Sequence, residues 1–178
     1  GSVSASGLSD GSYTVNMSFM GAGWNPNPRS YANYSMTADF SFVIDRSAPT
    51  ISGASTSSTG KYTNSSTYVS ASDSVSGVNA LYVKNPNNSY YSSAGTSTTI
   101  ASTGTNGLYC FYAKDKAGNT SATYYLYLDT VKPTGTIKNS NGTEITGSYT
   151  NQTFSYSATD SGSGISYLQY KKPGSSSW

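Results

Sequence analysis

Apolar and polar residues alternate with a period of two on both sides of a turn at residues 115–119. The apolar positions of one parity are Tyr109, Phe111 and Ala113 before the turn and Tyr124, Leu126 and Leu128 after it. Period-two alternation is typical of strands with one buried face. The turn reads DKAGN, and Asp, Gly and Asn are residues that turns favour. We therefore predict a β-hairpin over residues 107–129 whose apolar parity faces a core.

A second arm, near the N-terminus, opens like the first arm of this hairpin. Residues 8–13 read LSDGSY and residues 106–109 read NGLY, so that a Gly stands two positions before a Tyr in both. This is the pattern of a tyrosine corner, in which a Tyr at the start of a strand bonds back to the backbone upstream. We predict such corners at Tyr13 and Tyr109.

Three segments recur along the chain, which indicates a tandem array. The pairs are DRSAPT and DTVKPT at 45–50 and 129–134, GKYTN and GSYTN at 60–64 and 147–151, and ASDSVSGV and ATDSGSGI at 71–78 and 158–165. The first pair is offset by 84 residues (Pro49 to Pro133) and the other two by 87. A proline cannot donate a ladder hydrogen bond, which suits the start of an edge strand just past a junction. We therefore place domains at 1–45, 46–130 and 131–178.

The middle domain contains a full set of strand signals. Its predicted strands lie at 50–52, 67–72, 80–84, 89–92 and 98–101, followed by the hairpin. Seven short strands separated by turns indicate a β-sandwich. The expected inward positions are Val69, Ala71, Leu81 and Val83, with Tyr156, Ala158, Leu168 and Tyr170 as their counterparts in the next domain. By the same comparison, residues 1–45 match only the last two strands of a repeat, and residues 131–178 only the first three.

The composition of the chain argues against several classes of function. Charged residues are only 10% of the 178 residues and the net charge is +2, whereas a nucleic-acid surface needs clustered Lys and Arg. Histidine is absent and Cys110 is the single cysteine, which removes the usual general base and any intrachain disulfide or Cys-based zinc site. No segment approaches the ~20 apolar residues of a membrane helix. We predict an all-β protein that is not an enzyme, does not bind nucleic acid and has no membrane span in this chain.

The segment YCFYAKDKAGN at 109–119, followed by DTVKPT at 129–134, resembles the bacterial Ig-like repeats of large secreted and wall-anchored proteins of Gram-positive bacteria. The segment ATDSGSGI at 158–165 is similar to a loop of the same repeats. The resemblance implies tandem Ig-like β-sandwiches, one complete and flanked by two partial repeats. It also implies an extracellular location, secreted or anchored to the cell wall. Residues 1–45 depart from the pattern, because their last loop lacks the DKAGN turn and is longer.

In an Ig-like topology, two loops and the incoming linker meet at each junction between domains. The first junction would collect Asp45, Asp73, Asp115 and Asn119, and the second would collect Asp129 and Asp160. Carboxylate and amide oxygens without soft ligands suit Ca²⁺, which would stiffen the array. The alternative is that each Asp is an ordinary turn residue whose side chain bonds backbone amides.

Parity also predicts a tyrosine-rich outer face on the middle domain. The residues expected to face outward are Tyr82, Cys110, Tyr112, Tyr125 and Tyr127. Tyrosine rings can stack on sugars or dock a protein, since they combine apolar area with a hydroxyl. Alternatively, cross-strand tyrosine pairs only stabilise the sheet. Cys110 has no basic neighbour that would make its thiol reactive.

A third candidate site lies in the longer loop of residues 1–45. Trp24 and Tyr31 stand there beside several prolines. Long loops at the end of a sandwich often carry binding residues, so this loop could contact a glycan or a peptide. Equally, Trp24 could pack back onto its own domain.

These observations favour an extracellular spacer or stalk module whose partners are neighbouring Ig-like repeats. A second hypothesis is an adhesive module that binds a glycan or a host protein through exposed aromatic residues. A third is a filament or swapped dimer, formed when the two partial repeats of different molecules complement each other. The partial repeats could instead belong to a longer array.

Overall fold

The computed structural model describes residues 4–26, 29–171 and 174–176, with the side chains of 22–34 outside the description. Within these residues the chain is all-β, as predicted, and contains no helix. The strands are β1 (Gly11–Pro26), β2 (Arg29–Ile44), β3 (Thr50–Ser52), β4 (Lys61–Thr63), β5 (Thr67–Ser72), β6 (Val78–Lys84), β7 (Ser92–Ser93), β8 (Ser97–Ile100), β9 (Gly107–Asp115), β10 (Tyr124–Leu128), β11 (Thr134–Asn139) and β12 (Phe154–Thr159). The described part therefore offers no helix that could cross a membrane.

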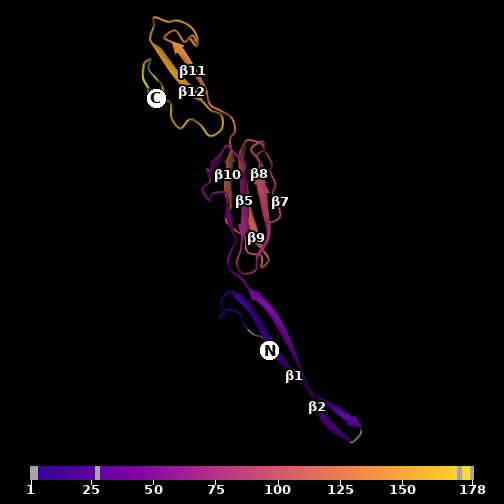
Figure 1. The fold of residues 1–178 in the computed structure, drawn as a ribbon. Helices are drawn as coiled ribbons and strands as arrows, with labels where there is room; N and C mark the ends of the chain where they lie inside the picture. The colour runs from indigo at the N-terminus through magenta and orange to yellow at the C-terminus, as the bar shows by residue number, and fades with distance from the viewer. Residues whose placement is uncertain (1–3, 27–28, 172–173, 177–178) are drawn as a thin grey trace.

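The strands form four sheets along an elongated chain (Figure 1). β1 pairs with β2 at one end, and β11 pairs with β12 at the other. Between them lie a five-stranded sheet, in the order β4-β10-β9-β6-β7, and a three-stranded sheet, in the order β3-β5-β8. These two central sheets share one hydrophobic core, which is the arrangement of a β-sandwich.

The core confirms the parity prediction for the central hairpin. Phe111, Leu126 and Leu128 are completely buried, and Tyr109 and Ala113 join them. The three-stranded sheet β3-β5-β8 contributes its own buried side chains, including Val69. Burial of each such large apolar side chain stabilises the fold by about 1.5–3 kcal/mol. The residues whose alternation predicts the hairpin therefore also stabilise the central sandwich.

Both tyrosine corners form as predicted. The Tyr109 hydroxyl donates to the Thr105 carbonyl at 2.9 Å, and the Tyr13 hydroxyl donates to the Ser9 carbonyl at 2.8 Å. Each bond reaches four residues back, so that it fixes the entry of β9 and of β1 in the same way.

Strand β4 is absent from the sequence prediction. Lys61–Thr63 pairs in parallel with β10, with Lys61 opposite Leu126 and Thr63 opposite Leu128. Three residues are too few to show an alternation, so this segment stands out in the sequence only as a repeated motif. Its pairing extends the five-stranded sheet at its edge.

The first hairpin corrects the expected loop around Trp24. β1 and β2 are each 16 residues long and stay paired up to Pro26 and Arg29, with Trp24 opposite Tyr31. The extra residues therefore lengthen a two-stranded ribbon and do not form a loop. Pro26 is the last residue of β1, where a missing N–H does not break the ladder.

The C-terminal segment corrects a second expectation. The repeat predicts a strand at residues 168–170, the counterpart of β6, but these residues are irregular. In the central sandwich β6 is held by β9, whereas the sheet β11-β12 has no further strand among the described residues. A strand without a partner leaves its backbone groups unpaired, so it is not stable.

Candidate functional site

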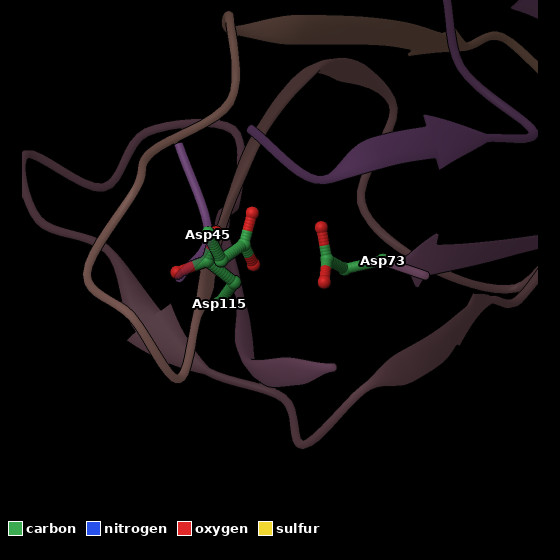
Figure 2. Close-up of side chains that lie close together, drawn as sticks. All are labelled: Asp45, Asp73 and Asp115. Carbon is green, nitrogen blue, oxygen red and sulfur yellow. The ribbon is translucent and has the colours of Figure 1, made fainter. Parts of the chain in front are cut away.

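Three aspartates meet where the first hairpin joins the central sandwich. Asp45 follows β2, Asp73 follows β5, and Asp115 is the last residue of β9. One carboxylate oxygen from each lies within 4.8 Å of the others, and Figure 2 shows Asp73 facing Asp45 and Asp115. Asp115 is buried. The structure thus brings together three of the residues that the sequence assigns to the first junction.

Two of these carboxylates hold their own loops. Asp115 accepts hydrogen bonds from the backbone amide and the side-chain amide of Asn119, both at 2.8 Å. Asp73 accepts the amides of Val75 at 3.1 Å and Gly77 at 2.9 Å. Bonds of this kind are what aspartate makes in turns. Each of the loops 73–77 and 115–119 is therefore stabilised by hydrogen bonds between its own aspartate and its own amides.

Asp45 links the first hairpin to the central sandwich across the junction. Its carboxylate accepts the amide and the hydroxyl of Ser76, with the amide at 3.0 Å, and the amide of Ser47 at 3.0 Å. These hydrogen bonds, the Ser76 hydroxyl first, lower the pKa of Asp45 below its ordinary value. The Asn119 side chain also donates to the Asp45 carbonyl at 3.0 Å, so Asn119 joins the loop 115–119 to the linker.

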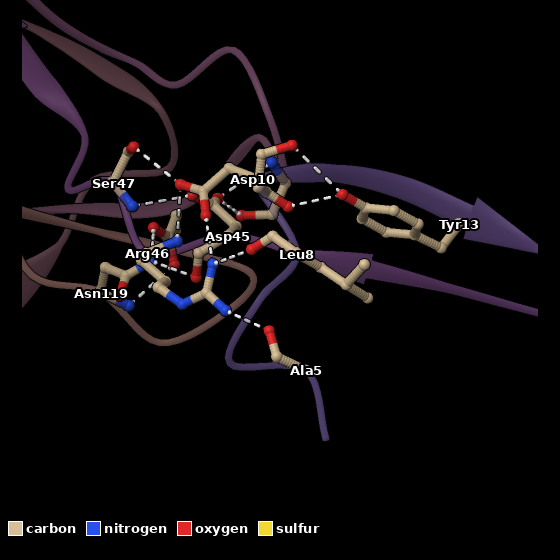
Figure 3. Close-up of polar contacts among 11 residues, drawn as sticks. Ala5, Leu8, Asp10, Tyr13, Asp45, Arg46, Ser47 and Asn119 are labelled. Atoms are coloured by element: carbon tan, nitrogen blue, oxygen red, sulfur yellow. Dashed lines mark hydrogen bonds and ion pairs between the residues drawn. The ribbon is translucent and has the colours of Figure 1, made fainter. Parts of the chain in front are cut away.

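Arg46 secures the linker on the hairpin side (Figure 3). Its guanidinium pairs with Asp10 at 3.0 Å and donates to the carbonyls of Leu8 at 3.1 Å and Ala5 at 3.0 Å. The backbone amide of Arg46, together with its side chain and Ser47, lowers the pKa of Asp10. Sequence reasoning missed this clamp. Its only signal is the Asp10 of the LSDGSY segment next to a predicted tyrosine corner.

The second junction repeats the bonds of the first. Asp129 accepts the amides of Ser163 at 2.6 Å and Val131 at 3.1 Å, as Asp45 accepts those of Ser76 and Ser47. The Ser163 side chain and amide lower the pKa of Asp129. The predicted pair of Asp129 with Asp160 thus lies at one junction, where both line the same hollow.

The partners of Asp129 also correspond to those of Asp45. Asp160 accepts the amides of Gly162 at 3.0 Å and Gly164 at 2.9 Å, which is the bonding of Asp73. Asn106 accepts the amide of Thr130 at 3.2 Å and its hydroxyl at 3.1 Å, in the place that Asp10 holds at the first junction. Two joints with different sequences therefore share these hydrogen bonds.

The first junction has the chemistry of a divalent-cation site, but its carboxylates already accept hydrogen bonds from the protein. Ca²⁺ takes six to eight oxygen ligands in its usual sites. The cluster supplies three carboxylates, and each accepts at least one turn amide. Among the described residues, Oδ2 of Asp73 is the carboxylate oxygen of this cluster that accepts no hydrogen bond. Asp45, Asp73 and Asp115 are the residues that would hold a cation, and both the calcium site and the alternative of ordinary turn aspartates stay predictions.

The tyrosine face of the central sandwich is built of rings that contact each other. Tyr82 and Tyr112 stack with centroids 4.7 Å apart and planes 9° apart. Tyr91 meets Tyr112 edge-on at 4.9 Å, and the Lys84 ammonium lies 5.5 Å from the Tyr91 ring centre. Further along the sheet, Tyr127 packs against Tyr62 at 5.3 Å. The prediction of this face does not include Tyr91 or Tyr62, because neither belongs to the central hairpin or to the strand at 80–84, from which the parity is taken.

This face is more covered than parity predicts. Tyr82, Tyr112, Tyr125 and Tyr127 are half-buried. Cys110, expected to be exposed, is buried. Burial raises the pKa of Tyr91, and the neighbouring Cys110, to which Tyr91 is hydrogen-bonded, raises it further. The segment before β7 therefore covers β9 on the side that parity assigns to solvent.

The third predicted site is Trp24 with Tyr31. Their backbones are paired in the outer part of the β1–β2 ribbon. Their side chains lie outside the described residues.

Comparison with family models, with curated proteins and with solved structures returns no match. The likeness to bacterial Ig-like repeats therefore rests on the sequence motifs.

Proposed function

We propose that this chain is a structural spacer from the extracellular part of a bacterial surface or secreted protein, built as an array of Ig-like sandwiches. The observation that carries the proposal is the repeated junction. Asp45 binds Ser76 and Asp129 binds Ser163 in the same way, so successive bodies are joined by one repeated set of hydrogen bonds. A spacer needs joints that keep a constant geometry.

The linkers also support a stiff array. Only five residues separate β2 from β3, and each of the two linkers contains a proline, Pro49 or Pro133. Prolines restrict φ, whereas Gly- and Ser-rich linkers behave as flexible coils. In the first linker, Asp45 bonds to Ser76 of the central sandwich, and Arg46 and Ser47 bond to Asp10 of the hairpin. This leaves little of the linker free to bend.

Small-angle X-ray scattering of the full chain tests the proposal. We expect one narrow distribution of shapes with a constant maximum dimension. The double variant Asp45→Ala, Asp129→Ala is expected to broaden it, while Asp39→Ala is the matched control because Asp39 bonds only within the ribbon, to Asn16. A native chain that already samples many shapes would rule out the spacer. An unchanged distribution in the folded double variant would show that these bonds do not stiffen the array.

A glycan- or protein-binding module is the second candidate, supported by the Tyr82–Tyr112 stack beside Lys84. The rings are half-buried and contact each other, which favours sheet stabilisation. A glycan array separates the two functions. Binding that Tyr112→Ala and Tyr125→Ala abolish, while Thr99→Ala on the other sheet leaves it intact, would support the binding module.

A further inference from the structure

The two linkers of the central sandwich lie at its opposite ends (Figure 1). The first linker leads into β3, on the side where Asp45 bonds to Ser76 and Asn119, and the second linker begins where β10 ends. Tension along the chain therefore enters the sandwich through β3 and leaves it through β10. The contacts between these two parts of the domain determine which bonds bear the load.

The chain changes sheets soon after the first linker, and it does so at Gly53. β3 pairs with β5 in the three-stranded sheet, whereas Ser55 already forms a bridge with Tyr125 of the five-stranded sheet. Gly53 has a φ of +87°, and a Cβ at this position would collide with the Tyr68 carbonyl. This crossing, which requires a glycine, places the chain that follows the first linker directly beside the strand that precedes the second.

The two segments are joined by backbone hydrogen bonds. The Ser55 amide donates to the Tyr125 carbonyl at 3.0 Å, and the Tyr125 amide donates to the Ser55 carbonyl at 2.7 Å. β4 then pairs with β10 from Lys61 to Thr63, and the Thr63 carbonyl accepts the Asp129 amide at 2.9 Å. These contacts of Ser55 and β4 with β10 and Asp129 are here called the shear contact.

β4 and β10 run parallel, and this direction determines how tension acts on them. The first linker pulls β4 back from its N-terminal end, while the second linker pulls β10 forward from its C-terminal end. The two strands are therefore loaded to slide past each other along their axes, so that all of their hydrogen bonds bear the load together. Strands that are pulled apart from one end instead lose their bonds one pair at a time.

β10 is held firmly on its other sides. Leu126 and Leu128 are fully buried in the core, and β9 pairs with the opposite edge of β10. On the outer face, Tyr62 of β4 packs against Tyr127 with ring centres 5.3 Å apart. A sliding β4 must therefore break the backbone bonds and this ring contact at the same time.

β3 cannot take over this load. Its partner β5 continues into neither linker, so a force on β3 reaches β10 only through side chains of the core. Within the part of the chain that the structure describes, the shear contact is the only backbone pairing between residues 50–63 and β10.

We propose that the central sandwich resists pulling force and that the shear contact is its load-bearing element. Under tension between the linkers, the sandwich stays folded until β4 slides off β10. The use of this resistance rests on the spacer function, because a spacer carries tension along the chain. The resistance itself depends only on the directions of β4 and β10.

Single-molecule force spectroscopy of the full chain tests the direction of loading. Handles on Ala48→Cys and Lys132→Cys, one in each linker, load β4 and β10 in shear. Handles on Ser58→Cys and Ala122→Cys, just before β4 and just before β10, pull the same two strands apart from one end. All four positions are exposed, whereas the native Cys110 is buried. We expect a several-fold higher unfolding force with the first pair of handles, and equal forces in the two directions would overturn the proposal.

Two tyrosine variants test the contact itself. Tyr62→Ala removes the ring that packs on Tyr127, whereas Tyr68→Ala removes a similarly exposed ring from β5, which is outside the shear contact. Pulled from the two linkers, Tyr62→Ala is expected to unfold at a lower force and Tyr68→Ala at the native force, since forced unfolding follows the unfolding rate. An equal response of the two variants would place the load elsewhere and refute the shear contact.

These measurements are independent of the scattering test of the spacer. A direction-dependent force together with a broad distribution of shapes would retain the shear contact and rule out the spacer. Equal forces together with one narrow distribution would retain the spacer and rule out the shear contact.

Discussion

Asp45 accepts hydrogen bonds from both the amide and the hydroxyl of Ser76, 31 residues further along the chain. The bond joins a linker to a loop of the following sandwich, and Asp129 with Ser163 forms its counterpart at the next joint. Each aspartate thus joins a linker to the following sheet through hydrogen bonds to its carboxylate.

The joints are expected to loosen only in acid. Hydrogen bonds lower the pKa of Asp45 and Asp129 from 3.8, so the folded junction favours the charged carboxylates. Their contribution is complete above pH 3.8 and is lost as the pH falls through the lowered folded-state values. Scattering measured between pH 7 and pH 2 checks this, with Asp45→Asn, Asp129→Asn as a control whose response is flatter. Loosening already at pH 6 would contradict it.

The tyrosine corner of the central sandwich is expected to contribute measurably to its stability. Tyr109→Phe keeps the ring and removes the bond to the Thr105 carbonyl, which should lower the free energy of unfolding by about 0.5–1.5 kcal/mol. Urea unfolding of the central transition measures this. Tyr13→Phe, which removes the corresponding bond of the ribbon, should leave that transition unchanged.

Equivalent positions in the two hairpins should respond differently to truncation. Leu126 is fully buried and Phe42 is 41% exposed, although they have the same place in the strand register. Leu126→Ala should cost about 2–5 kcal/mol in the unfolding free energy of the central sandwich. Phe42→Ala should have a smaller effect, because much of the Phe42 side chain is exposed already. Calorimetry compares the two variants, and an equal loss of stability for Phe42→Ala would contradict this prediction.

Calcium is expected to leave the melting temperature unchanged, because the carboxylates of the first junction already accept turn amides. Calorimetry with calcium and with a chelator tests this. An increase in melting temperature that Asp73→Asn removes, while Asp39→Asn retains it, would contradict the expectation and support the calcium site predicted from the sequence.

The local features of this protein follow from its sequence. The alternation around Phe111 and Leu126 identifies both strands of the central hairpin and the face that is buried, because side chains of a strand point to opposite sides in turn. The upstream bonds of Tyr13 and Tyr109 span only four residues, so a short pattern is enough to predict them. The repeat offsets likewise predict that Asp45 and Asp129 occupy equivalent positions.

What the sequence does not reveal depends on partners that are distant in the chain. Three-residue β4 is a strand only because β10 lies beside it, and Arg46 forms its clamp only because the ribbon returns to Asp10. Cys110 has the outward parity that alternation assigns to it, yet it is buried because the segment of Tyr91 covers it. Residues 168–170 have the composition of a strand but no partner. Periodicity determines which way a side chain points, whereas the tertiary structure decides what lies opposite it, because pairing and burial require a second surface.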